Sequence, residues 1–291
     1  MEEKTKAKRK KIHVIIYLLL SVLIVLSIMY IINFFSLKQE AKEQSKLLNA
    51  TDIYKMKDTQ EVVQNRLEDE KENVTSESEL EENGEMIATE NAEKQNEETE
   101  RMLQVKQLQE QNADIVGWLE IENTNMNYPV LQGTDNRYYM THNYKKESSK
   151  NGSIFLDANY NWNIPSNNLL IYGHNLGNGM MFQELLKYEK ESFYQEHPVI
   201  RFTTAEEDAE YEIISVFKSR VYYKSEKNVF RYYYFINSES EEEYNQFVKN
   251  VKNASLYPID ATANYGDQLI TLSTCSYYVD DGRFAVVGRK K

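Results

Sequence analysis

The sequence of 291 residues contains only one cysteine and four histidines. A single cysteine excludes an internal disulfide framework and a cysteine-rich zinc site. Acidic residues outnumber basic ones by 46 to 34, and because binding to a phosphate backbone takes clustered lysine and arginine, we expect no nucleic-acid partner. No acidic cluster has the pattern of a calcium loop, so we also predict no metal and no cofactor.

Charge is absent altogether from Ile12 to Leu37, which follows a basic start with a net charge of +4. The 24 residues 12–35 are long enough to cross the ~30 Å hydrocarbon core of a membrane. A secretory signal peptide is the alternative, but its apolar run would be shorter and a small-residue cleavage site would follow. We therefore predict a cytoplasmic tail over 1–11 and an uncleaved transmembrane anchor over 12–35, with the rest of the chain outside the cell.

The next segment, 36–100, has no proline and only one aromatic residue, Tyr54. Residues 38–100 carry a net charge of −11 out of −12 for the whole chain. Such a composition buries too little apolar surface to offset the entropy of ordering the chain. We predict a disordered acidic linker here.

The remaining 101–291 holds 19 of the 22 tyrosines and both tryptophans, and we predict one folded domain. Helical spacing of apolar residues predicts helices near 101–112, 180–188 and 238–254. Short apolar runs between turn residues predict eight strands. These runs are 118–121, 128–131, 153–156, 168–172, 199–203, 211–217, 269–274 and 284–287. Since strands and helices do not alternate, a mostly antiparallel barrel or sandwich is expected.

Cys275 ends a strand-like run and precedes a polar turn, so its thiol is a candidate nucleophile. An imidazole partner is needed, and His174 follows the apolar run 168–172 at the start of a glycine-rich loop. His142 and His197 lie in polar loop contexts, and His13 lies at the membrane.

Arg283 begins the strand after Cys275, and its guanidinium is a candidate for stabilising an oxyanion. If the two strands are neighbours, the short connection brings both side chains to one rim. Arg289 lies at the far end of that strand, away from this rim.

The run Thr271-Leu-Ser-Thr-Cys275, followed by Asp281-Gly-Arg283, resembles the signature of the sortase family. Asn168-Leu-Leu-Ile-Tyr-Gly-His174 is similar to the histidine motif of that family, and the resemblance extends from about Val105 to Arg289. Three details resemble class B: Ser273 within the cysteine motif, the helix over 238–254, and the Gly-Ser-Ile-Phe-Leu-Asp run at 152–157.

The resemblance implies a closed eight-stranded β-barrel with added helices. It also implies a transpeptidase that cleaves a C-terminal sorting motif of the Asn-Pro-x-Thr-Asn type after threonine. Cys275 would form a thioacyl intermediate, His174 would transfer protons, and Arg283 would hold the oxyanion and substrate carbonyls. Ser273 is a further candidate for contacting the substrate. The expected partners are sorting-signal peptides of surface proteins and an amine from a peptidoglycan precursor or cross-bridge.

Two other functions remain open from the residues alone. A cysteine endopeptidase of papain type would release a free acid, although such enzymes place cysteine before histidine and no Cys-Gly-x-Cys-Trp run is present. A non-catalytic surface binding domain would instead bury Cys275 as an inert apolar side chain.

Overall fold

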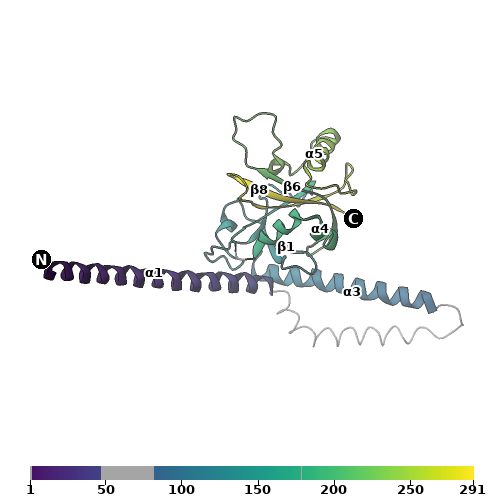
Figure 1. Cartoon of the computed structure of the whole chain (residues 1–291). Coiled ribbons are helices and arrows are strands. Elements are labelled where there is room, and N and C mark those ends of the chain that lie inside the picture. Colours follow the sequence, from purple (N-terminus) through teal and green to yellow (C-terminus); the bar gives the residue numbers. More distant parts are fainter. Residues whose placement is uncertain (1, 47–81, 178) are drawn as a thin grey trace.

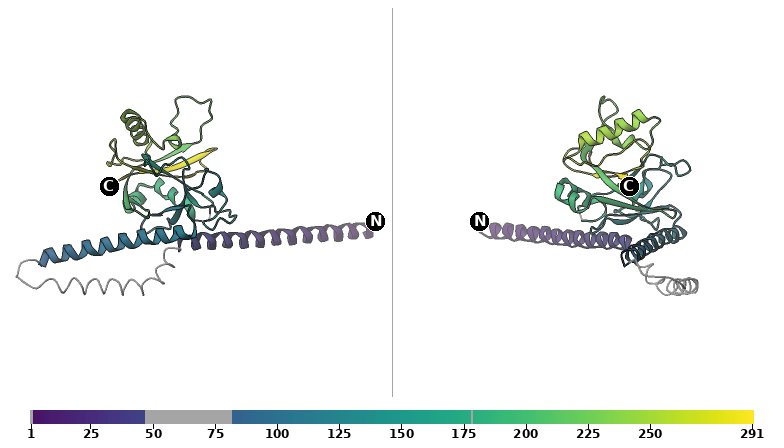
Figure 2. Two further views of the ribbon diagram at one scale, coloured as in Figure 1. Left: turned by 180° about the vertical axis from the view of Figure 1, so that it is seen from behind. Right: turned by 90° about the vertical axis from the view of Figure 1, so that its right-hand side faces the viewer.

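The structure is a computed structural model that describes residues 2–46, 82–177 and 179–291. A β-barrel forms its centre. Helices α1 (Glu2–Ser45) and α3 (Glu82–Gln111) run past one side of the barrel, and α5 (Glu241–Ala254) covers the opposite side (Figures 1 and 2). The short α4 (Glu191–Glu196) and the 3-10 helices η1 (Tyr138–Met140), η2 (Met181–Glu189) and η3 (Tyr232–Tyr234) lie in the connections.

Eight strands close the barrel in the order β1-β2-β3-β4-β7-β8-β6-β5. Their bounds are β1 (Ile115–Glu120), β2 (Asn127–Leu131), β3 (Ile154–Leu156), β4 (Asn168–Gly173), β5 (Val199–Thr203), β6 (Asp208–Arg220), β7 (Leu269–Cys275) and β8 (Gly282–Lys290). The predicted eight-stranded closed barrel is therefore confirmed. Two neighbouring pairs, β2–β3 and β4–β7, are parallel, and the other six are antiparallel.

The barrel interior is a continuous apolar core, which includes the fully buried Tyr128, Phe217 and Phe284. All residues of β7 before Cys275 are buried, which explains why the sequence of this strand shows no alternation with charged residues. A strand covered on both faces has no solvent side on which polar residues would alternate.

Helix α5 is capped at its N-terminus by Ser240, whose side chain accepts a hydrogen bond from the backbone N–H of Glu243. Three glutamates follow in the first turn, where the helix dipole favours negative charge. Its buried face, made of Tyr244, Phe247, Val248 and Val251, matches the apolar positions in the sequence. Helix formation here follows from the cap and the apolar stripe together.

The two ends of the acidic segment, residues 36–45 and 82–100, are more helical than their composition indicates. Helix α1 continues through residues 36–45, and α3 occupies 82–100 before it reaches the barrel. The predicted disordered linker over 36–100 thus has helical ends, and its centre lies outside the described residues. Glutamate, glutamine, lysine and alanine are good helix formers, which explains helix without a large apolar content.

Candidate active site

Cys275 is the last residue of β7, and its free thiol is half-buried at the rim of the barrel. In the antiparallel β7–β8 pair, Cys275 lies directly opposite Arg283. The intervening turn is held by hydrogen bonds from Ser276 N to Gly282 O (2.9 Å) and from Gly282 N to Val279 O (3.1 Å). A Cβ on Gly282 would lie 2.1 Å from the carbonyl oxygen of Ser276, so only glycine fits this turn.

His174 follows β4, which pairs in parallel with β7 so that Gly173 lies opposite Thr274. The next residues along these two strands are His174 and Cys275. Thr274 Oγ1 donates to the carbonyl oxygen of Gly173 (2.8 Å), and Asn175 Nδ2 donates to that of Cys275 (3.0 Å). Side-chain hydrogen bonds therefore join the two strand ends on either side of the candidate catalytic pair.

The imidazole of His174 is oriented by a backbone carbonyl. Its Nε2 lies 2.7 Å from the oxygen of Met140, which belongs to η1. Because a carbonyl oxygen can only accept, Nε2 carries the proton in this arrangement and Nδ1 is left as the other proton site.

A cleft of about 250 Å3 joins the predicted residues at this end of the barrel. It is lined by Asn136, Met140, Phe155, Tyr172, Gly173, His174, Ser273, Thr274, Cys275 and Arg283. The guanidinium of Arg283 is held at the rim because NH1 donates to the carbonyl oxygens of Asp281 (3.3 Å) and Gly282 (2.9 Å). All four site residues expected from the sequence thus border one cleft.

Ser273 borders the cleft but is almost wholly buried, and its contact with substrate stays a prediction. Only 2% of the residue is exposed, and its hydroxyl lies 2.7 Å from that of the buried Tyr232. Burial raises the pKa of Tyr232 well above its ordinary value, so this hydroxyl keeps its proton at neutral pH. Tyr232 comes from the long β6–β7 connection, and nothing in its sequence context indicated a place beneath the cleft.

Tyr172, Asp157 and Asn136 form a second group that the sequence analysis did not identify. The hydroxyl of Tyr172 donates to the Asp157 carboxylate (3.0 Å), as does the side-chain amide of Asn136 (2.8 Å). Burial, followed by the nearby Asp157 charge, raises the pKa of Tyr172. Asp157 therefore holds two residues that line the cleft, Tyr172 and Asn136. In the sequence, the position of Asp157 at the end of the 152–157 run was the only indication of this role.

The other histidines lie elsewhere. His142 stacks on Tyr138 with ring centroids 4.1 Å apart, and His197 packs against Phe193 at 4.4 Å. Neither lines the cleft. Within the described ranges, no group of three or more His, Cys, Asp or Glu side chains could hold a metal ion.

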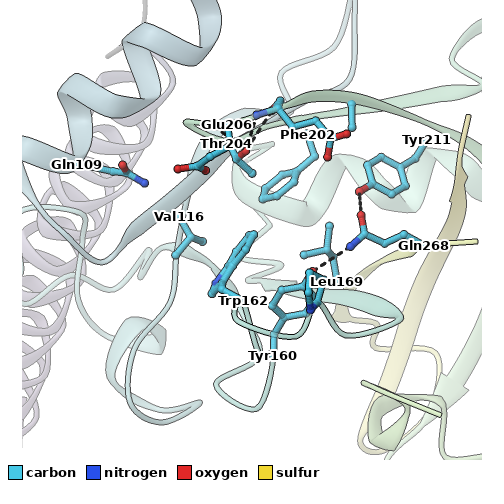
Figure 3. Close-up of a pocket in the computed structure, with 13 residues that line it drawn as sticks. Gln109, Val116, Tyr160, Trp162, Leu169, Phe202, Thr204, Glu206, Tyr211 and Gln268 are labelled. Carbon is cyan, nitrogen blue, oxygen red and sulfur yellow. Dashed lines mark hydrogen bonds between the residues drawn. The ribbon is translucent and has the colours of Figure 1, made fainter. Parts of the chain in front are cut away.

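A larger cavity, of about 520 Å3, lies at the opposite end of the barrel. It borders the start of β4 and the residue before β7, whereas the cleft borders the ends of those strands. Tyr211 donates to Gln268, and Gln268 donates to Tyr160 across its wall (Figure 3). Its lining contains no cysteine or histidine, so size alone does not identify the catalytic site.

Comparison with known proteins adds to this geometry, since the model of the sortase domain matches residues 119–291. The chain belongs to the sortase family. Sortase B of Listeria monocytogenes is 35% identical over 190 residues, which cover 64% of this chain and 73% of that protein. Sortase B of Staphylococcus aureus is 32% identical over 188 residues, which cover 64% and 74%.

Solved sortase B structures share the fold. The crystal structure of Staphylococcus aureus sortase B has a TM-score of 0.58 at 32% identity and covers 65% of this chain and 86% of that one. A Staphylococcus aureus sortase B–substrate complex has a TM-score of 0.58 at 29% identity, with 70% and 97% covered. A sortase B complexed with triglycine has a TM-score of 0.59 at 29% identity, with 71% and 98% covered.

This sortase is a cysteine transpeptidase of the sortase B type, as the sequence motifs predicted. Helix α1 supplies a candidate membrane span over Ile15–Ser45, the only one in the described part of the chain. Its apolar side chains from Ile15 to Ile32 are exposed, as lipid contact requires.

Proposed function

We propose that Cys275 is the nucleophile of this transpeptidase and that His174 is its general acid and base. The thiolate attacks the carbonyl carbon of threonine in a sorting peptide, and the peptide bond breaks as His174 protonates the leaving amine. The thioacyl enzyme is then attacked by an amine. His174 takes the proton of that amine, the C–S bond breaks, and a new amide is released. The observation that supports this assignment is the parallel β4–β7 register, in which Gly173 pairs with Thr274 and the next residues of the two segments are His174 and Cys275.

The hydrogen bond to Met140 supports a specific proton site on His174. Since Nε2 is held by a backbone carbonyl, we assign proton exchange with substrate to Nδ1. Arg283, opposite Cys275, would stabilise the developing oxyanion with the guanidinium N–H groups that its turn leaves free.

The substrate we propose is a C-terminal sorting peptide of the Asn-Pro-x-Thr-Asn type, and the acceptor is a peptidoglycan-derived amine. The substrate complex and the triglycine complex of related sortases support a peptide donor and an amine acceptor. The basic start of α1 supports an N-terminus in the cytoplasm and a catalytic domain outside the cell. The domain limits at 11, 35 and 100 stay predictions, and α3 crosses the last of them.

Matched variants of the full chain test the nucleophile and the base. We expect Cys275→Ala to abolish formation of the new amide, and His174→Ala to lower it by at least about 100-fold, the usual scale of acid–base catalysis. His197→Ala serves as the control because it removes a histidine outside the cleft. Transpeptidation retained by Cys275→Ala would refute the assignment.

A second pair of variants tests Arg283. Loss of one oxyanion donor typically lowers kcat by about 100- to 1,000-fold, so we expect Arg283→Ala to lower kcat by a factor in that range. Arg289→Ala is the control, since it lies on the same strand opposite Leu269 at the far end. Equal effects of the two variants would remove Arg283 from the mechanism.

Product analysis separates transfer from hydrolysis. With a sorting peptide and added triglycine, mass spectrometry should detect the transferred amide, which depends on the amine. Free acid alone at every amine concentration would favour the endopeptidase alternative.

A further inference from the structure

The last two turns of α1 lie outside the hydrocarbon region. The candidate span Ile15–Ser45 has 31 residues, about 46 Å of helix, which exceeds a ~30 Å hydrocarbon core. Its polar part begins at Lys38. This end of the helix is therefore available for contact with the barrel, where Figure 1 shows α1 ending.

One face of these turns packs against the loop 141–153, which follows η1. Ala41 is fully buried and Gln44 is 1% exposed, although both lie near the end of a helix whose apolar middle is exposed. Gln44 Nε2 donates to the carbonyl oxygen of Gly152 (3.3 Å), and Asn151 Nδ2 donates to that of Leu37 (2.7 Å). Residues 37, 41 and 44 share one side of the helix, so this is a built interface.

Charged and amide groups extend the same interface. Lys145 pairs with Glu43 at 2.9 Å. The side-chain amides of Asn143 and Asn151 both donate to the Glu40 carboxylate at 3.3 Å. Asn151 is fully buried in this contact.

The same loop is hydrogen-bonded to η1, whose last residue, Met140, orients His174. Ser153 N donates to the oxygen of Tyr139 (2.8 Å), which fixes the loop against η1. Gly152 has φ +59°, and a Cβ there would lie 2.7 Å from the oxygen of Met140. Met140 O in turn accepts from His174 Nε2. The hydrogen bonds of Gln44 to Gly152, of Ser153 to Tyr139 and of His174 to Met140 thus link α1 to the imidazole through neighbouring residues of the loop and of η1.

We propose that Gln44 is a positioning residue of the active site. By holding Gly152, the membrane-proximal end of α1 keeps the Met140 carbonyl where it orients the imidazole of His174. The anchor is then part of the catalytic unit as well as its attachment to the membrane. This inference rests on the proposed acid–base role of His174.

The loop 141–153 is also held by hydrogen bonds that do not involve α1, and these limit how far the loss of Gln44 can lower the rate. Asn112, just after α3, donates to the carbonyl oxygen of Tyr144 (2.7 Å) and to the hydroxyl of Tyr139 (3.4 Å). Loss of Gln44 should therefore loosen the loop without unfolding the barrel. We expect a partial loss of rate, about fivefold, as for one buried amide–carbonyl hydrogen bond.

The test compares two leaving groups in the full chain, purified in detergent. One sorting peptide has its normal scissile amide, and the other has a thioester at the same bond. Departure of an amine needs a proton from His174, whereas departure of a thiolate does not. Single-turnover formation of the thioacyl enzyme is followed by mass spectrometry.

Gln44→Ala should slow acylation by the amide about fivefold and acylation by the thioester by less than about twofold. Gln39→Ala makes the same change on the exposed face of the same turns and should match the wild type. Asn151→Ala removes the donor to Leu37 from the domain side and should behave like Gln44→Ala. Melting temperatures of the variants identify any loss of fold, which would slow both substrates equally.

His174→Ala is the reference that keeps the two proposals apart. If it slows the amide far more than the thioester, while Gln44→Ala and Asn151→Ala match Gln39→Ala, the positioning role is refuted and the proposed function stands. If His174→Ala slows both substrates equally, the acid role fails, and the inference fails with it.

Discussion

The hydroxyl pair beneath the cleft leads to a prediction that distinguishes support from substrate contact. Ser273 is 2% exposed and Tyr232 is fully buried, with their oxygen atoms 2.7 Å apart. Ser273→Ala leaves the hydroxyl of Tyr232 without that partner in a dry interior, which costs about 1–3 kcal/mol of unfolding free energy. For a folded unit of this size, about 2 kcal/mol lowers the melting temperature by about 4–8 °C.

A double-mutant cycle measures the interaction energy between the hydroxyl groups of Ser273 and Tyr232. Tyr232→Phe should destabilise the protein to a similar extent, because it leaves Ser273 unpaired. The double variant should lose less than the sum of the two, since neither polar group then remains buried alone. Thermal unfolding in detergent, followed by tryptophan fluorescence, gives the three differences. Ser192→Ala, on the exposed part of α4, is the control and should change stability by less than about 0.5 kcal/mol.

The reasoning would be refuted by a Ser273→Ala variant that melts like the wild type but has a raised KM for the sorting peptide. That result would mean that the serine hydroxyl faces substrate instead of Tyr232. Additive effects in the cycle would also contradict a direct hydrogen bond between the two hydroxyl groups.

Two further predictions concern stability away from the cleft. Burial alone would raise the pKa of Asp208, but a hydrogen bond from Thr203 and the ion pairs with Arg101 and Arg201 hold that pKa below its ordinary value. The network therefore stabilises the fold above about pH 5 and loses this effect as the pH falls below about 4, so Asp208→Asn should cost about 2 kcal/mol at pH 7 and much less at about pH 3. An equal difference in melting temperature at both pH values would contradict this. Ser240→Ala removes the cap of α5 and should cost about 1 kcal/mol in thermal unfolding, whereas Ser240→Gly should cost only a few tenths.

Strand positions were predictable because each strand has a local signature. The run 199–203 matches β5 in full, and the other seven runs differ from the observed strands only at their ends. Apolar and β-branched residues between turn residues carry that information within a few positions. The pairing of the strands could not be predicted in this way, because no short stretch of sequence indicates that β4 and β7 are parallel neighbours.

The candidate site was predictable where a residue stands at the end of a recognisable element. Cys275, His174 and Arg283 satisfy this condition, and the register brings them together as the short β7–β8 connection suggested. Tyr232 and Met140 do not, since their roles arise from contacts between distant segments. The hydrogen bond from His174 to Met140 spans 34 residues, and the one between Tyr232 and Ser273 spans 41.

The helical ends of the acidic segment do not follow from its composition, because few apolar residues argue only against a core within the segment itself. Near the membrane, Ala41 and Gln44 are buried by contact with the barrel, not by contact within the segment itself. A helix with few apolar residues can thus be stabilised by docking one narrow face. Such a face is too short to stand out in a sequence dominated by Glu and Lys.

The parallel pairing of β4 with β7 also determines how much of the chain must be present before the candidate site can form. The hydrogen bond between Asn175 and the backbone of Cys275 joins residues 100 positions apart, so it closes a long loop of the chain. During synthesis the imidazole is made long before the thiol, and the barrel cannot close until β7 and β8 fill the gap between β4 and β6. An incomplete chain therefore lacks either Cys275 or the neighbouring strands that set it beside His174 and Arg283. The order of the strands along the chain thus makes the candidate site one of the last parts of the barrel that can be completed.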